Sequence, residues 1–332
     1  MKQMAFILLI LTSSPFLFAQ AFQPVSVPLG VIEKVVVRGF KGKLEIIPSS
    51  SDELHVEGRK NGGGRFDQWK FQVRKKQNTM EVLVKGPSET EDWEKLRSKS
   101  ELPSFDLKVR VPKRSLEIFW GEGSVVVKRW VSPISLQMTE GDVSFEKGEG
   151  PLMAQLIKGR LKITEHQGNI GLQTFNGQVF LENTKGSLNV NNHSSSYQVK
   201  DHQGPSDFRN HSGTVVYKAI KGNMSLKNVS GVISLTELDG SFEGEFDKGA
   251  INVEALKLQN FVVNTNSAPI TLKFPKDSGA RVKLRSEKGR LRAPSHLRKI
   301  RKGRWTELRG QLRGGEQGQI KIVSKYGDIM LK

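Results

Sequence analysis

A glycine recurs at every ninth residue through the middle of this chain, and this spacing constrains the fold more than any other feature. Of 13 consecutive positions nine residues apart, 12 are glycine and only Ser195 interrupts the series. Glycine reaches backbone conformations that other residues avoid, so each one can mark a corner of the chain. The glycines are Gly141, Gly150, Gly159, Gly168, Gly177, Gly186, Gly204, Gly213, Gly222, Gly231, Gly240 and Gly249.

The residues that follow each glycine alternate between apolar and polar. The second and fourth residues after each position are apolar at 24 of 26 sites, with Ser206 and Gly244 as the exceptions. Alternation over about five residues is typical of a strand with one buried face. A strand and a corner together therefore fill the nine residues.

One such unit cannot bury its own face, whereas two units back to back form a coil that stacks on the next coil. We therefore predict an all-β fold, a single-stranded parallel β-helix or β-solenoid with about 18 residues per coil. The 13 positions give about six and a half coils, or roughly 31 Å at the usual strand spacing. The repeat leaves the handedness open, and we favour a right-handed coil. A β-sandwich with evenly spaced hairpins is the alternative.

The regions outside the repeat divide the chain further. Residues 86–103 are the most loop-like stretch, and short strand patterns flank the repeat on both sides. The predicted parts are a signal peptide over 1–21, an N-terminal β-rich part and cap over 22–122, the solenoid core over 123–275 and a basic C-terminal β cap over 276–332.

The first residues predict export from the cytoplasm. Lys2 precedes a short apolar run from Ala5 to Leu11, and Ala19 to Ala21 form a small-residue site for cleavage before Phe22. The chain has no cysteine, which excludes disulfides and a lipidated N-terminal cysteine. No later segment approaches the roughly 20 apolar residues of a transmembrane helix. We expect a periplasmic, extracellular or cell-surface protein that is not a lipoprotein.

The segments around the repeat resemble a known family. They are Phe105 to Pro112, Leu116 to Ile118, Gly123 to Val127 and the closing Gly318 to Ile329. With the repeated units, they resemble the bacterial putative-adhesin family of exported β-solenoids, often described only as a domain of unknown function. Its units typically carry an acidic residue after the glycine, which only Asp142 and Asp328 keep here. The resemblance implies the architecture and supplies no catalytic residues.

Metal binding is the first chemistry that the repeat could support. Calcium-binding nonapeptide solenoids need carboxylates in their corners, and here the residue after a repeat glycine is Asp only at Asp142. Residues 18 apart should stack, so one pair of histidines would lie close enough for a transition-metal ion. The same position elsewhere holds apolar residues such as Phe175 and Ile220, so we favour packing and predict no metal and no cofactor. The histidines at this position are His166, His193, His202 and His211.

Catalysis is the second chemistry. Glu165 and Asp201 lie two coils apart with Asn183 between them, about 9 to 10 Å at the standard spacing. This separation is at the outer edge of the range for an inverting glycosidase. The same repeat position also holds residues that favour turns and can form a ladder along a corner. We favour the ladder and predict that the chain is not an enzyme. The residues in question are Asn192, Asn210 and Asn228.

A basic cluster lies near the end of the chain. Residues 281–313 hold 13 Lys and Arg against two Glu, a formal +11 of the +18 carried by the whole sequence, and Trp305 sits among them. Arginine and lysine bind phosphates and carboxylates, so this cluster predicts an anion-binding surface. Alternatively, the charges guard an open solenoid end against edge-to-edge association. The predicted anion-binding residues are Arg281, Lys283, Arg285, Lys288, Arg290, Arg292, Arg298, Lys299, Arg301, Lys302 and Arg304.

These features predict an exported, non-catalytic, adhesin-like scaffold of the bacterial cell envelope. Its partner would be an anionic polysaccharide, lipopolysaccharide or another envelope polymer, and a specific nucleic-acid partner is not expected. The alternative is a carbohydrate-active β-helix enzyme, a polysaccharide hydrolase or lyase. An enzyme should show converging carboxylates in a groove, and a scaffold should show uniform polar ladders.

Overall fold

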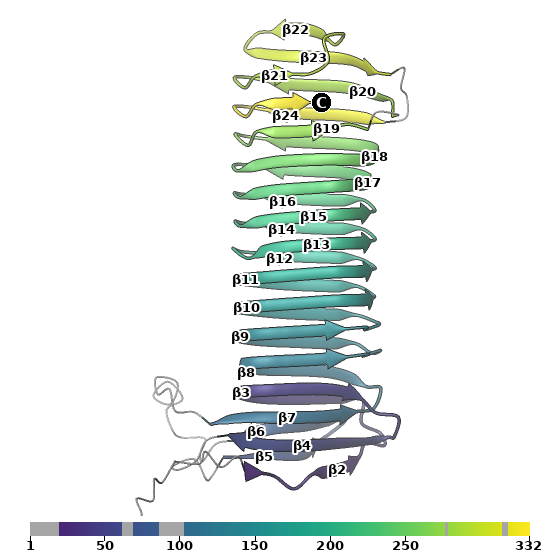
Figure 1. Cartoon of the computed structure of the whole chain (residues 1–332), viewed down its shortest axis with the longest axis vertical. Coiled ribbons are helices and arrows are strands. Elements are labelled where there is room, and N and C mark those ends of the chain that lie inside the picture. Colours follow the sequence, from purple (N-terminus) through teal and green to yellow (C-terminus); the bar gives the residue numbers. More distant parts are fainter. Residues whose placement is uncertain (1–19, 62–68, 86–102, 276–277, 314–317) are drawn as a thin grey trace, which may run out of the picture.

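The computed structural model is a tall column of stacked strands (Figure 1). It describes residues 20–61, 69–85, 103–275, 278–313 and 318–332. Within these ranges every regular element is a β-strand, and they form a parallel β-solenoid of about nine turns with about 18 residues per coil. The predicted fold class is therefore confirmed. Most of the predicted signal peptide and of the loop-like residues 86–103 lies outside the described residues.

The middle of the column is built from strands that repeat with a shift of 18 residues. Leu152 of β10, for example, is opposite Ile134 of β9 and Ile170 of β11. The strands here are β8 (Ser115–Lys128), β9 (Ile134–Glu146), β10 (Leu152–Gln167), β11 (Ile170–Lys185), β12 (Leu188–Asn192), β13 (Ser196–Gln203), β14 (Ser206–Asn210), β15 (Thr214–Lys221), β16 (Met224–Asn228), β17 (Val232–Phe246) and β18 (Ala250–Thr265). Each coil contributes one segment to a first sheet, such as 152–156, and one to a second sheet, such as 161–167.

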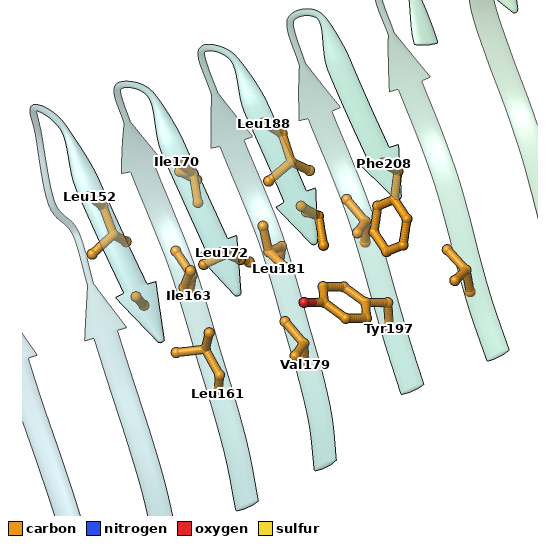
Figure 2. Packing of buried hydrophobic residues seen from close by; sticks show 14 of the residues in the cluster. Leu152, Leu161, Ile163, Ile170, Leu172, Val179, Leu181, Leu188, Tyr197 and Phe208 are labelled. Atoms are coloured by element: carbon orange, nitrogen blue, oxygen red, sulfur yellow. The ribbon is translucent and has the colours of Figure 1, made fainter. Parts of the chain in front are cut away.

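The apolar side chains predicted to point inward fill the space between the two sheets. Figure 2 shows Leu152, Ile170 and Leu188 in one row, with Leu161 and Val179 facing them from the other sheet. Even the two exceptions in the repeat, Ser206 and Gly244, are buried. Burial of apolar surface along this continuous core provides the main stabilisation of the fold, at roughly 25 cal/mol for each Å².

Glycine is required at the corners for two reasons. The φ angle of Gly159 is +132°, in the region that residues with a Cβ avoid. In addition, a Cβ on Gly159 would overlap the carbonyl oxygen of Gly141, one coil below. The corner glycines thus form two stacks along the column, one on each edge.

The two edges of the column differ, although the nine-residue repeat treats them alike. We call the corner at Gly159 the first corner and the corner at Gly168 the second corner. Three asparagines at the first corner form a buried ladder. The side-chain amide of Asn192 donates to the side-chain oxygen of Asn210, and that of Asn210 donates to Asn228, each at an N···O distance of 2.6 Å. The predicted asparagine ladder is therefore confirmed, but it lies on the opposite edge from Glu165 and Asp201.

The N-terminal end of the column mixes parallel and antiparallel pairs. β3 (Lys34–Pro48) pairs in parallel with β8 and begins the stack, and β4 (Glu53–Asn61) pairs antiparallel with β7 (Ser104–Val111). These strands match the short strand patterns of the sequence. The remaining ones are β1 (Gln20–Ala21), β2 (Val25–Pro28), β5 (Lys70–Lys76) and β6 (Thr79–Lys85).

The C-terminal end departs from chain order. β24 (Gln319–Ser324) pairs with β18 on one side and with β20 (Ala280–Ser286) on the other. β25 (Ile329–Leu331) lies in the same way between β19 (Ile270–Lys273) and β21 (Leu291–Arg292). The last strands of the sequence therefore lie inside the stack, beneath the cap (Figure 1). The cap ends in β22 (Arg298–Lys302) and β23 (Trp305–Leu312).

Candidate anion-binding surface at the C-terminal cap

The basic cluster lies on the last three strands of the column. β23 pairs antiparallel with β20, and β22 pairs with β23 as the outermost strand. In β20 the inward positions are apolar or small, so the basic residues alternate onto the outer face. In β22 every residue except Ile300 is basic and exposed. Charge on an outermost strand discourages pairing with another chain.

The structure separates the eleven predicted residues into three groups. Arg281, Lys283 and Arg285 lie on the outer face of β20, in the first sheet. Lys288 and Arg290 lie in the next corner and Arg292 lies in β21, which pairs with β25 in the second sheet. The third group lies on β22 and in the turn to β23, and consists of Arg298, Lys299, Arg301, Lys302 and Arg304.

The groups differ in how their charges are engaged. Arg304 Nε lies 3.5 Å from an oxygen of Glu287, and the Arg285 guanidinium lies 4.2 Å from the centre of the Trp305 ring. Lys288 lies 5.1 Å from the Tyr326 ring. Among the described residues, the four basic side chains of β22 make no ion pair or hydrogen bond, so their charges are available to a partner.

A groove of about 750 Å³ reaches this cap from the solenoid below. It follows the first corner and ends at Glu287, Arg304 and Trp305. No pattern in the sequence indicated this groove, because Glu287 is close to the other residues only through the pairing of β20 with β23 and β24. Of the carboxylates that line it, Glu245 pairs with Lys227 at 2.9 Å, whereas Glu287 has one oxygen without a hydrogen-bond partner among the described residues.

The four histidines that share one repeat position are divided between the two edges. His193 and His211 lie at the first corner, exposed and stacked, with ring centres 5.0 Å apart, as the 18-residue spacing predicted. His166 and His202 are buried at the second corner. The described residues contain no cluster of three or more His, Cys, Asp or Glu side chains that could hold a metal ion.

Burial governs the chemistry of the second pair. It lowers the pKa of both His166 and His202. His202 Nδ1 lies 2.9 Å from the Thr184 hydroxyl, and His166 Nε2 lies 3.0 Å from the Gly150 carbonyl oxygen. These side chains are part of the core rather than of a surface site.

The candidate catalytic carboxylates lie on the second corner. Glu165 and Asp201 line a shallow hollow together with Asn183, and all three have a φ angle near +53°. Glu165 lies 3.8 Å from Lys147 and Asp201 lies 3.7 Å from Lys200. Both carboxylates are substantially exposed, so they lack the apolar surroundings that a buried general acid uses.

Comparison with known families identifies the architecture. The model of the family described as Toastrack DUF4097 matches residues 32–332. The chain belongs to this family. The match extends over both ends of the Toastrack column, including the basic cap. No curated protein matches the chain.

The chain is also similar to several solved structures, and three of them carry the following names. One is a putative cell adhesion protein from Clostridium sporogenes, at 14% identity and a TM-score of 0.24, covering 95% of this chain and 99% of that one. A putative adhesin from Parabacteroides merdae has 13% identity and a TM-score of 0.31, covering 75% and 95%. A putative lipid binding protein from Parabacteroides distasonis has 13% identity and a TM-score of 0.35, covering 93% and 96%.

The described residues contain no helix long and apolar enough to cross a membrane.

Proposed function

We propose that this Toastrack chain is an exported, non-catalytic, adhesin-like scaffold whose C-terminal cap binds an anionic polymer of the cell envelope. An acidic polysaccharide and the phosphates of lipopolysaccharide are the partners that fit this chemistry. The N-terminal sequence supports export, and the adhesin names of related structures support a binding role. The column would hold the cap away from the opposite end of the molecule (Figure 1).

The observation that carries this proposal is the outermost strand. Arg298 and Lys302 are opposite Arg309 and Trp305 of β23, so they share the outer face of the first sheet. Lys299 and Arg301 point to the other side of the same strand. Four exposed cations within five residues, without partners among the described residues, create a positive field that attracts polyanions.

The engaged carboxylates favour a non-catalytic role. Glu165 and Asp201 are exposed and lie beside lysines, and Asp247, in the groove, accepts a hydrogen bond of 2.8 Å from Asn266. The outer faces instead carry polar ladders, such as the ion pair of Lys200 with Glu182 over 2.7 Å. A scaffold with laddered side chains fits this pattern better than a hydrolase or lyase.

A heparin-affinity experiment tests the proposal. The quadruple variant Arg298→Ser, Lys299→Ser, Arg301→Ser and Lys302→Ser should elute from heparin at lower salt than the unmodified chain. Its affinity should also depend less steeply on salt, because each cation that no longer pairs with the polyanion reduces the counterions released by roughly one. The free energy of unfolding should change little, since each surface substitution of this kind usually moves it by about half a kcal/mol or less.

A matched variant controls for net charge. Arg160, Lys162, Lys185 and Lys221 are exposed and lie in the middle of the column, and changing them to serine removes the same four charges. This variant should elute close to the unmodified chain. If the two variants eluted together, heparin affinity would follow net charge alone and the cap would not be its site.

A further inference from the structure

The groove beneath the cap is continuous along several coils. Asn191, Arg209, Lys227 and Glu245 lie in register along one wall, one from each successive coil of the first sheet. The buried asparagine ladder forms its floor, and exposed residues of the first corner, including His211, form the other wall. This wall of the groove therefore presents one polar side chain at every strand spacing, about 4.8 Å.

The end of the groove contains a carboxylate without a full set of partners. The Glu287 side chain is only 9% exposed. Its Oε1 lies 3.5 Å from Arg304 Nε, while its Oε2 is buried and has no hydrogen-bond partner among the described residues. A buried acceptor of this kind is costly unless a donor reaches it. Glu287 lines the groove, so a turn of its carboxylate would present this oxygen to a hydroxyl of a ligand in the groove.

A flat aromatic surface lies beside this carboxylate. Trp305 is half-buried and also lines the groove, and the Arg285 guanidinium stacks on one face of its ring, so a ligand would meet the other face. Arg304 and Lys325 place positive charge at the same end. The site therefore combines an acceptor for a hydroxyl, an aromatic ring for an apolar face and cations for an acidic group.

We propose that this groove binds an acidic linear polysaccharide that lies parallel to the solenoid axis. Pyranose rings have hydroxyl donors and apolar faces, and uronate residues add carboxylates. An extended glycan repeats at a distance close to the coil spacing, so each successive sugar meets one polar side chain of the wall. A polyphosphate chain has no donor for Glu287 and no ring for Trp305, which makes it the weaker match. This inference deepens the proposed function and rests on it.

Glu287→Ala distinguishes binding by charge alone from binding through a hydroxyl, because the two predict different changes in the affinity for an acidic glycan. The change makes the groove more positive, so a site that works by charge alone should bind every polyanion as well or more tightly. If Glu287 instead accepts a hydroxyl, the variant should bind oligogalacturonate of six residues more weakly and long-chain polyphosphate no less tightly. Isothermal titration calorimetry on the full chain measures both ligands. Glu287→Gln, which keeps an acceptor oxygen, serves as a second variant if alanine impairs folding.

Trp305→Ala gives the second readout. It should weaken oligogalacturonate binding by about tenfold, as removal of one stacked ring commonly does, and change polyphosphate binding by less than about twofold. Phe180→Ala, on the outer face of the second sheet, is the matched control and should change neither. The oligosaccharide should be recovered uncleaved.

The outcomes separate the two proposals. If oligogalacturonate binding is unaffected by Glu287→Ala and Trp305→Ala but abolished in the quadruple β22 variant, the groove inference is overturned and the cap proposal stands. If heparin and polyphosphate do not bind while oligogalacturonate binds in a manner that needs Trp305, the proposed role of the β22 charges is wrong and the groove remains. Binding of none of these ligands overturns both.

Discussion

At the residue scale, the corner glycines explain why the repeat is so regular. Each has a positive φ angle, and at all of them except Gly150 a Cβ would overlap a carbonyl oxygen of the coil below, as it would at Gly159 against Gly141. These two requirements act together, so even alanine is excluded. Ser195 avoids the conflict differently, because its backbone N–H donates to the Asn192 side chain over 2.9 Å and its φ angle is not positive.

Gly159→Ala should therefore destabilise the solenoid. A residue with a Cβ in such a backbone region costs about 1–3 kcal/mol, before any movement of the Gly141 carbonyl. Urea unfolding should show a lower midpoint. Gly171→Ala is the matched control, since Gly171 has no positive φ angle and its Cβ would meet only the flexible, 59% exposed Met153. Equal midpoints for the two variants would contradict this account of the corners.

The buried histidines should make the solenoid sensitive to acid. Burial lowers the pKa of His202 in the folded chain below its unfolded value of about 6.5. The unfolded chain therefore takes up the proton first, and the free energy of unfolding should fall as pH decreases below about 6.5. His202→Leu should flatten this dependence, because Ile220 and Leu238 already occupy the same stack. Parallel stability curves for both chains between pH 7 and pH 5 would show that His202 does not contribute.

The sequence predicted these residues only in part. A nine-residue period places His193 and His202 at equivalent positions, yet the coil has 18 residues and its two corners differ. At the first corner the side chain of His193 points outward, and at the second corner that of His202 points into the core. The difference arises from the left-handed backbone of residues such as Asp201 at the second corner, which no pattern of residue types revealed.

At the element scale, the inserted C-terminal strands were the main feature that the sequence did not predict. Residues 318–331 show the glycine and alternation of one coil, and they lie in the cap that the sequence predicts over 276–332. The structure places that coil between those of β18 and β20. Local pattern specifies that a segment forms a coil, whereas its position in the stack depends on pairing partners distant in sequence.

A chain that ends at Arg313 lacks β24 and β25, so the rest of its cap can no longer pair with the solenoid through them. Ile320 and Ile322 are fully buried between β18 and β20, so removing them exposes apolar faces on both neighbours. We expect a lower melting temperature and increased binding of a hydrophobic dye, because terminal units protect the ends of solenoids. Lys321→Ser, which alters only an exposed residue of β24, should change neither. A truncated chain that melts like the full one would show that the inserted coil is dispensable.

At the scale of the whole molecule, charge is concentrated at one end of a long column. The positions of the basic residues in the sequence predicted this concentration, because 13 Lys and Arg fall within residues 281–313, and they predicted a single cluster. Pairing in the cap divides them instead, with Arg292 in the second sheet and the four β22 cations at the end of the column. The sequence analysis counted Glu287 only as one of two negative charges within the basic cluster. In the structure its side chain is buried and lines the groove.

Lysine acetylation in the presence of heparin tests the central claim, that polyanions bind at the cap. Lys299 and Lys302 lie exposed on the outermost strand, whereas Lys162, Lys185 and Lys221 are exposed in the middle of the column. Saturating heparin should protect the first two several-fold from an acetylating reagent and leave the other three reactive, as measured by mass spectrometry of the digested chain. Protection spread evenly over all five lysines, or confined to the middle of the column, would contradict the account.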